Sequence, residues 1–406
     1  MAHSISASRQ DRTLLAIVVE GFLSRLSLGL VSLALPLYAL HLGMSLSAIG
    51  VLVSVNVVVQ LVAKPLMAPL ADRVGHRRSL IIAIVGRSVV CLLFVFTTLP
   101  WQLFAVRLLY GLTQALRDPP LNAVIAEAGG KKRVASTFAW YHTAKNVAAS
   151  LGRAAAGLLL AATGNNYRLV FLVAFVMSLI PLAVMVRYVR PPEQVRAEQA
   201  IPVGPVSMPR VLPLTVLGFL FGTTAGMLNL FPAIASKYFG LGPAEIGLIL
   251  LASTVVVIVA GPMFGWLADH VSRTLVLMVR GLANVASSLM YLAFPSVWGV
   301  GASKIVDDTG KAAFRPAWGS VMAEVASHQP QRRAQVMTLI DIGEDAGDAA
   351  GPILAGWLLV VGGLPLMLGV RCGLALLTEI WAWWVAHRLT PSESDRSDAA
   401  ARAGAG

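Results

Sequence analysis

The sequence is poor in charge and in cysteine. Only 13% of its 406 residues are Asp, Glu, Lys or Arg, whereas a soluble globular protein carries about a quarter. Both cysteines, Cys91 and Cys372, fall inside apolar runs, which excludes a disulfide framework. The sequence also lacks a P-loop, H-E-x-x-H, G-x-S-x-G and any clustered Cys/His metal pattern. We therefore expect no enzyme activity, no cofactor and no metal site.

Long apolar runs take up most of the chain, and most approach or exceed the ~20 residues that a helix needs to cross a bilayer. Because the hydrocarbon layer holds no water, each crossing segment must satisfy its own backbone hydrogen bonds, which predicts helices. The sequence thus predicts an all-α membrane protein with twelve transmembrane helices. We place them near residues 13–41, 46–70, 79–99, 102–128, 136–162, 167–189, 211–239, 244–268, 274–294, 297–325, 334–361 and 365–388.

Basic residues gather on one side of this topology. Since cytoplasmic segments of membrane proteins are enriched in Lys and Arg, the bias predicts a multi-pass protein of the cell (inner) membrane with both termini in the cytoplasm. It accounts for most of the net charge of +12 without a nucleic-acid partner. The loops are short, and we expect a monomer. The inside segments hold Arg9, Arg12, Arg73, Arg77, Arg78, Lys131, Lys132, Arg133, Arg187, Arg190, Arg196, Arg210, Arg273, Arg332, Arg333 and Arg388, and the opposite loops hold little beyond Arg168 and Lys237.

The longest polar break, "RPPEQVRAEQAIPVGPVSMPR", divides six predicted spans from six. It is rich in Pro, Gln and Glu and has no apolar period, so it is typical of a linker. We expect two pseudo-symmetric six-helix bundles at 13–189 and 211–388, joined by a cytoplasmic linker at 190–210. A cytoplasmic N-terminus at 1–12 and a disordered cytoplasmic tail at 389–406 flank them.

The two halves match at a nearly constant offset, which indicates an internal duplication, the usual construction of secondary transporters. "GRAAAG" at 152–157 falls on "GPILAG" at 351–356, an offset of 199. An offset of 197 relates Asp72 to Asp269, Pro119 to Pro316 and Glu127 to Glu324.

The stretch "APLADRVGHRR" at 68–78, between the second and third spans, resembles a signature of the major facilitator superfamily: Gly, three residues, Asp-Arg, one residue, Gly, then basic residues. Ala68 replaces the leading Gly. "RLLYGLTQ" at 107–114 resembles the fourth-span motif of the drug:proton antiporter-like efflux members, with Arg107 and Gly111 in register. The resemblance covers roughly residues 13–388.

The resemblance implies that Asp72 faces the N-terminal end of the eleventh span when the outer side is open. That helix end carries partial positive charge. Arg73, Arg77 and Arg78 can form ion pairs with Glu127 at the end of span four. Such pairs would form a latch, which breaks when the inner side opens. Alternatively, the arginines only set the topology. The candidate gating residues are Asp72, Arg73, Arg77, Glu127, Asp269, Arg273 and Glu324.

Charged residues also lie inside the spans, where each costs roughly 2.5–3.5 kcal/mol and usually faces a cavity or a partner. In "KIVDDTGKAAFR", the spacings Lys304–Asp308 and Asp307–Lys311 suit pairing along one helix. The resemblance implies that spans one, four, seven and ten line the cavity. Alternatively, these charges pair with one another and only lock the bundle. The candidate substrate-binding residues are Glu20, Arg107, Arg117, Asp118, Asn229, Lys304, Asp307, Asp308, Lys311 and Arg315.

Four carboxylates in span eleven, Asp341, Glu344, Asp345 and Asp348, share one helix face. Repulsion and desolvation favour protonation of some of them, which a proton-coupled carrier requires. Glu20, the lone acid of span one, is the rival proton-coupling residue. Alternatively, this acidic face bridges the two halves by ion pairs.

The sequence therefore favours a secondary active transporter that moves a small organic molecule by alternating access, with proton-coupled efflux. Its expected partners are that substrate, protons and the lipid bilayer. Uptake of a small organic anion and a non-transporting receptor or scaffold are the alternatives. The sequence leaves open the substrate, the direction of transport and the coupling ion.

Overall fold

The computed structural model describes residues 2–188, 208–271, 273–327 and 332–389, which hold helices and no strand. Residues 190–207 of the predicted linker (190–210) and 390–406 of the predicted tail (389–406) lie outside the described residues, whereas 208–210 begin α6 and Leu389 ends α11. The helices of the first half are α1 (Ala2–His41), α2 (Leu46–Val74), α3 (His76–Phe96), α4 (Pro100–Ala162) and α5 (Tyr167–Tyr188). Those of the second half are α6 (Met208–Gly226), η1 (Met227–Leu230), α7 (Phe231–Phe239), α8 (Pro243–His270), α9 (Arg273–Ala293), α10 (Val297–Ser327) and α11 (Arg333–Leu389).

Short turns at one end of the molecule, which we call the loop end, join successive helices. Ser45 caps α2, and its hydroxyl accepts a hydrogen bond from the Ala48 amide at 3.2 Å. Gly240 ends α7 in the left-handed conformation, with φ of 66°. The other end, where α5 stops at Tyr188 and α6 starts at Met208, is the linker end.

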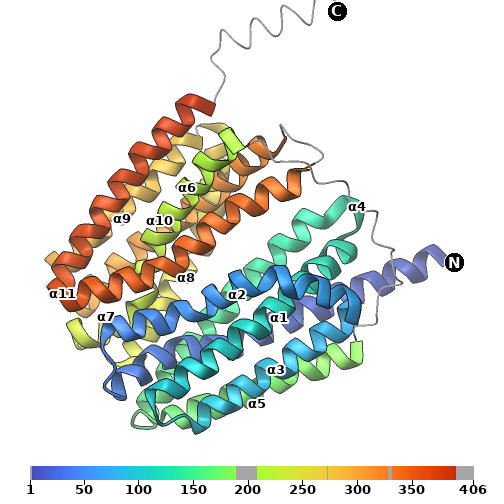
Figure 1. Ribbon diagram of the computed structural model, residues 1–406, viewed down its shortest axis with the longest axis horizontal. Coiled ribbons are helices and arrows are strands. Elements are labelled where there is room, and N and C mark those ends of the chain that lie inside the picture. Colours follow the sequence, from blue (N-terminus) through green and yellow to red (C-terminus); the bar gives the residue numbers. More distant parts are fainter. Residues whose placement is uncertain (1, 189–207, 272, 328–331, 390–406) are drawn as a thin grey trace, which may run out of the picture.

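Helix α4 differs from the expected pair of separate spans, because its backbone stays helical through the predicted break at 129–135. Its two ends nevertheless lie close together. The Tyr38 hydroxyl donates to the carbonyl of Thr97, just before α4. The Tyr38 ring also contacts that of Tyr167, just after α4, with the ring centroids 5.1 Å apart. A straight helix of 63 residues would separate these ends by about 95 Å, so α4 doubles back and forms a first and a second arm (Figure 1).

Three further features of the helices can be compared with the sequence analysis. The predicted boundary between 361 and 365 is present, because Gly363 breaks the helical geometry of α11 with φ of 68° and ψ of −164°. The predicted single span at 211–239 is interrupted by η1. At the start of the chain, the polar segment that we expected to precede the first span is part of α1, which begins at Ala2.

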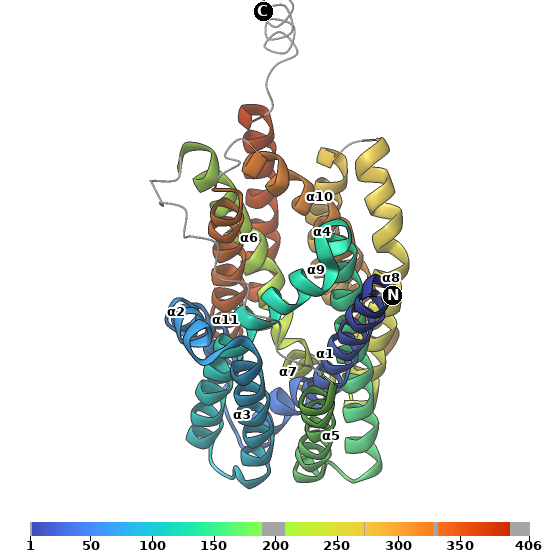
Figure 2. The same ribbon diagram turned by 90° about the vertical axis from the view of Figure 1, so that its right-hand side faces the viewer.

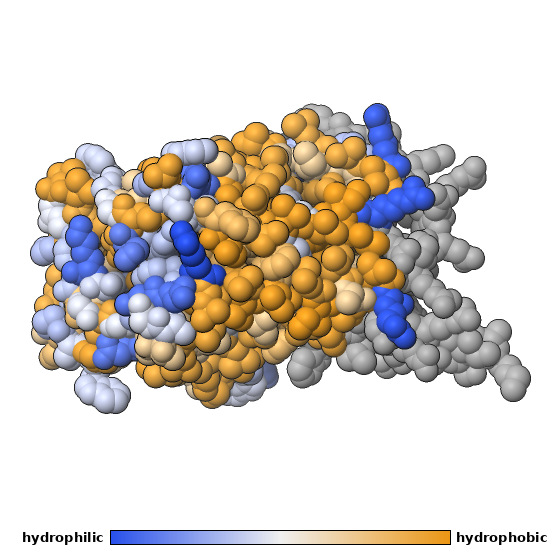
Figure 3. Space-filling view, turned by 90° about the horizontal axis from the view of Figure 1, so that it is seen from below, coloured by the Kyte–Doolittle hydropathy of each residue, from blue (hydrophilic) through white to orange (hydrophobic). Residues whose placement is uncertain are grey.

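Seven helical stretches of the described chain are long and apolar enough to cross a membrane. They lie in α1, α2, α3, α5, α6–α7, α8 and α11. Helices α4 and α10 are not among these stretches, and both carry several charged residues. Figure 3 shows the outer surface that results: a broad apolar band with hydrophilic side chains towards both ends. Because charged side chains are costly against lipid, we expect the charged faces of α4 and α10 to point into the bundle.

Helices pack mainly within their own half of the sequence. In the first half α1 packs on α4 and α5, and α3 packs on the same two helices; in the second, α11 packs on α6, and α10 packs on α8 and α9. Figures 1 and 2 show the first half, in blue to green, beside the second, in yellow to red. The halves meet where α2 lies against α11 and where α4 lies against α8.

Glycines make these two contacts between the halves close, and the contacts are related by the repeat. A Cβ on Gly50 of α2 would lie 2.2 Å from the Pro352 carbonyl oxygen of α11. Gly247, which lies 197 residues after Gly50, meets Arg153 of α4 in the same way, at 3.0 Å. Small residues let helix backbones approach this closely. Both contacts lie toward the loop end, so the helix backbones of the two halves are in close contact there.

Buried apolar side chains follow the same division. One cluster draws on both halves at the loop end and includes Leu46 and Ile49 of α2 with Leu358 and Leu359 of α11. A second cluster, which includes Trp318, contains only residues of the second half. The apolar core thus joins the two halves at one end of the molecule.

Candidate functional site

A fully buried carboxylate in the first half is held by two arginines from other helices. Glu20 of α1 has no exposed surface. Arg117 of α4 donates from Nη2 to both of its carboxylate oxygens, at 3.0 and 2.8 Å, and Nη1 of Arg87 of α3 lies 4.0 Å from Oε1. The Ser24 hydroxyl adds a hydrogen bond of 2.5 Å. Glu20, the lone acid of the predicted first span, is therefore paired with cations from two other helices, which stabilises its charge away from water.

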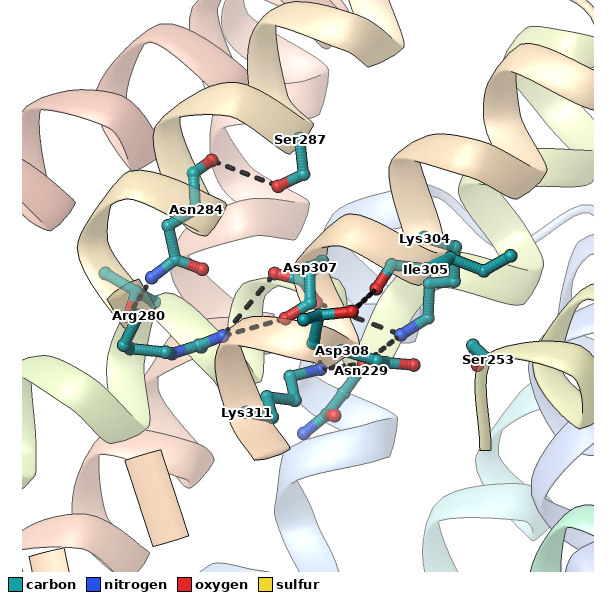
Figure 4. A network of polar contacts seen from close by, with 12 residues as sticks. Asn229, Ser253, Arg280, Asn284, Ser287, Lys304, Ile305, Asp307, Asp308 and Lys311 are labelled. Atoms are coloured by element: carbon teal, nitrogen blue, oxygen red, sulfur yellow. Dashed lines mark hydrogen bonds and ion pairs between the residues drawn. The ribbon is translucent and has the colours of Figure 1, made fainter. Parts of the chain in front are cut away.

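The second half contains a matching arrangement around Asp307 of α10 (Figure 4). Asp307 is fully buried and accepts a hydrogen bond from Nη2 of Arg371 in α11. Nη1 of Arg280 in α9 lies 3.6 Å from its Oδ1, and Nζ of Lys311 lies 3.0 Å from its Oδ2. Each half thus buries one carboxylate between arginines that come from separate helices.

The charges of α10 pair along the helix as the sequence spacing predicts. Nζ of Lys304 lies 2.6 Å from Oδ1 of Asp308, and Lys311 bonds the same oxygen at 2.9 Å. In Figure 4 Arg280 approaches Asp307 from one side and the two lysines from the other. Four cations, those of Arg280, Lys304, Lys311 and Arg371, thus face two carboxylates, so this group carries a surplus of two positive charges.

An acidic cavity of about 160 Å³ opens beside this group. Three of the four carboxylates predicted to share a face of span eleven line it: Glu344, Asp345 and Asp348 of α11. Asp341 is exposed. Asn229, in the interruption between α6 and α7, donates to Oδ1 of Asp348 at 2.9 Å. The remaining described lining is Phe221, Gly222, Ala225, Arg280, Lys311 and Phe314.

Lys64 of α2 connects the two halves by ion pairs. Its Nζ lies 3.7 Å from Oδ2 of Asp118 in α4 and 3.9 Å from Oδ2 of Asp345 in α11. The Gln60 amide donates to the same Asp118 oxygen at 2.5 Å. The three charged side chains are 37%, 30% and 49% exposed. Since Lys64 lies 14 residues beyond Gly50 on α2, it is about 21 Å from the close contact of Gly50 with Pro352.

Arg107 takes a different position from the other candidates. It donates from Nε to the Leu52 carbonyl and from Nη2 to the Val53 carbonyl of α2, both at 3.3 Å. Its guanidinium group lies over the Tyr110 ring, 5.4 Å from the ring centroid. It lines a separate cavity in the first half.

The candidate latch residues are mostly beyond what the structure describes. Arg73 is exposed at the linker end. The side chains of one binding candidate, Arg315, and of six gating candidates lie outside the described residues: Asp72, Arg77, Glu127, Asp269, Arg273 and Glu324.

The structure adds residues that the sequence analysis did not select. Arg87, Arg280 and Arg371 are all nearly or fully buried and contact the two central carboxylates, and Lys64 joins the halves. Each is an isolated charge in an apolar run, which is itself a signal of function. Their partners lie on other helices, so spacing along one helix could not reveal them.

A bundle of apolar helices around paired buried charges and a polar cavity is the architecture of a membrane transport protein. The family model of the Major Facilitator Superfamily matches residues 18–232 and, again, residues 214–405. The chain belongs to this superfamily, and it is a transporter rather than an enzyme.

Known proteins of similar sequence and structure agree with this family. The chain is 24% identical over 382 residues to "Multidrug resistance protein MdtG" of Citrobacter koseri, and the aligned region covers 89% of this chain and 92% of that protein. It is 23% identical over 362 residues to "Multidrug resistance protein 1" of Bacillus subtilis, covering 86% and 90%.

Solved structures share the fold at lower sequence identity. A bacterial homolog of the human lysosomal transporter Spinster, in an inward-facing and occupied conformation, matches with a TM-score of 0.75 and 15% identity, over 92% of this chain and 96% of that one. The nucleoside transporter NupG (D323A mutant) matches with a TM-score of 0.73 and 15% identity, over 93% and 100%.

Proposed function

We propose that the chain crosses the inner membrane twelve times as two six-helix bundles and works as a monomer, with both termini in the cytoplasm. The doubled-back α4 and the break of α11 at Gly363 each supply two crossings. The other ten helical elements supply eight, because α6, η1 and α7 form one crossing. Packing of helices within each half of the sequence supports the two bundles.

The protein exports a small organic molecule by alternating access, driven by protons. Its relatives named for multidrug resistance support export. The state described here is closed at the loop end, where glycines bring α2 against α11 and α4 against α8. Opening that end requires these contacts to separate while the linker ends of the bundles approach. The latch at the linker end, built from Asp72 and its partners, would hold the second state.

The observation that carries this proposal is the acidic cavity beside the charged group of α10. Its carboxylates have access to water and lie next to the ion pair that joins the halves. Protonating Asp345 removes the charge that attracts Lys64, so proton binding changes a contact between bundles. The substrate contacts the same region, through Asn229, Lys304, Asp308, Lys311 and the residues around Arg117.

The carboxylates of α11 are better placed than Glu20 to carry the proton. A carrier must reach water in order to load or release its proton. Glu20 has no exposed surface and is held by Arg117, Arg87 and Ser24. Asp345, by contrast, is 49% exposed.

Flux into proteoliposomes tests the function. The purified protein is reconstituted, and entry of radiolabelled neutral, cationic and anionic compounds is measured with the interior acidic, with no pH gradient and with the interior alkaline. We expect the acidic interior to accelerate entry of at least one compound over protein-free vesicles. Flux that ignores the gradient would remove the proton from the proposal. No flux of any compound would favour a receptor or scaffold.

Uptake of an organic anion is the second candidate, and the surplus of cations in the charged group favours it. The same experiment separates the two directions. Uptake coupled to protons in symport would be accelerated by an acidic exterior, that is, by the opposite gradient.

A further inference from the structure

A second cavity, of about 250 Å³, lies wholly among helices of the first half. Arginines reach it from three sides: Arg25 from α1, Arg107 from the first arm of α4 and Arg153 from the second arm. Apolar side chains form much of the remaining wall. The other described lining residues are Leu28, Gly29, Val31, Ser32, Asn56, Val90, Cys91, Phe94, Tyr110 and Ala149.

The described residues that line this cavity include no carboxylate. Arg107 donates to two backbone carbonyls of α2, and Arg153 donates to the Ser150 hydroxyl at 2.6 Å. These acceptors are neutral, so they satisfy hydrogen bonds without balancing charge. Asp308 of α10 attracts Arg153 electrostatically, but that carboxylate is already bonded by two lysines.

One guanidinium donor in the same wall is left without an acceptor. Nε of Arg153 is buried and finds no hydrogen-bond acceptor among the described residues. A buried donor without an acceptor costs about 1–3 kcal/mol, and more when it is charged. Clustered guanidinium groups inside a membrane domain are more costly still, unless an anion joins them.

The two cavities have opposite character. The cavity of the second half is lined by Glu344, Asp345 and Asp348 together with Arg280 and Lys311, whereas the described wall of the first-half cavity holds three arginines and no acid. In the second-half cavity an anionic ligand meets carboxylates as well as cations, whereas in the first-half cavity the only charged side chains of the described wall are cations.

We propose that Arg25, Arg107 and Arg153 form an anion subsite that takes the carboxylate of a small organic molecule, whose apolar body packs against Leu28, Val31 and Phe94. This inference rests on the proposed transport function, because it assigns the substrate class. Arg107 is already anchored to α2, so Arg25 and Arg153 are the residues that discriminate between charged and neutral ligands.

A pair of ligands that differ only in charge tests the subsite. Equilibrium dialysis measures the binding of radiolabelled benzoate and benzamide to purified protein in detergent. We expect benzoate to bind at least tenfold more tightly than benzamide, because hydrogen bonds to charged groups contribute about 1.5–3 kcal/mol. Equal binding of the two compounds, or binding of neither, would overturn the subsite.

Substitutions locate the ligand. Arg25→Gln and Arg153→Gln should each weaken benzoate binding about tenfold or more and leave benzamide binding unchanged, which also shows that the variants are folded. Arg153→Lys keeps the charge and should retain part of the affinity. The matched control is Lys237→Gln, which removes an exposed cation at the end of α7. Equal effects of the control and the two glutamine variants would overturn the proposal.

The binding assay tests the anion subsite and the flux assay tests transport, so the failure of one proposal can be distinguished from the failure of the other. Charge-selective binding in detergent without flux in vesicles would uphold the anion subsite and reject transport. Flux of compounds that does not depend on Arg25 or Arg153 would uphold transport and reject the subsite.

Discussion

Nζ of Lys64 in α2 and Oδ2 of Asp345 in α11 lie 3.9 Å apart and join the two halves of the chain far from the loop end. The same lysine lies 3.7 Å from Asp118 of its own half. Lys64 therefore has one acidic partner that stays with it and one that leaves when the halves separate. The ion pair with Asp345 is the one that a conformational change must break or strengthen.

A double-mutant cycle on Lys64→Gln and Asp345→Asn measures this link. Both groups are partly exposed, so we expect a coupling energy of about 0.2–1 kcal/mol. The readout is the population of the state closed at the loop end, from electron-electron distance measurements on spin labels. A cycle on Lys64→Gln and Asp118→Asn is the control, because that pair lies within one half and should not affect the population. A coupling of zero between Lys64 and Asp345 would contradict the bridge.

Loss of Arg371 should destabilise the second half. Arg371→Gln leaves the buried Asp307 without one of its arginines and also removes bonds to Asn284 and Ser288. Breaking a buried pair by removing one partner costs about 3–5 kcal/mol. Denaturant unfolding in detergent micelles measures the loss. Arg168→Gln, at an exposed arginine of the loop end, should change the stability by no more than about 0.5 kcal/mol. Similar losses in the two variants would show that the buried cluster is unimportant for stability.

The proton-coupling assignment separates Glu20 from the carboxylates of α11. Glu20→Gln should reduce the stability by a few kcal/mol, because Arg87 and Arg117 lose their counter-charge. Among Glu344→Gln, Asp345→Asn and Asp348→Asn, at least one should fold normally and lose the dependence of flux on the pH gradient. The reverse outcome, a stable Glu20→Gln that is uncoupled while all three α11 variants stay coupled, would assign the proton to Glu20.

The closed loop end should depend on Gly50. In Gly50→Ala, the added Cβ would lie 2.2 Å from the Pro352 carbonyl oxygen, so the two helices must move apart. Gly261→Ala is the matched control, since a Cβ on that helical glycine of α8 meets nothing within 4 Å. Spin labels at Thr98 and Trp298, exposed positions at the loop end of each half, should report a longer distance in Gly50→Ala alone. An unchanged distance would mean that the contact tolerates a side chain.

The sequence predicted much of the fold because bilayer thickness imposes a length on every apolar run. It also predicted the pairs within α10, since residues four apart on one helix must meet. The polar stretch at 129–133 led to a predicted break, whereas the backbone of α4 stays helical through it. The interruption at Met227–Leu230 lies inside one long apolar run, so hydropathy does not mark it. Contacts between helices, such as Arg371 with Asp307, depend on how the helices pack, which the spacing of residues along one helix does not predict.

The central claim is that the two halves move as alternating bodies around the charged interior. Two label pairs test it in lipid nanodiscs, with Cys91 and Cys372 replaced by alanine: Thr98 with Trp298 at the loop end, and Leu70 with Val271 at the linker end. Acidification from pH 8 to pH 5 should populate a second state, in which the loop-end distance lengthens as the linker-end distance shortens. Distances that stay fixed, or that lengthen together at both ends, would contradict alternating access.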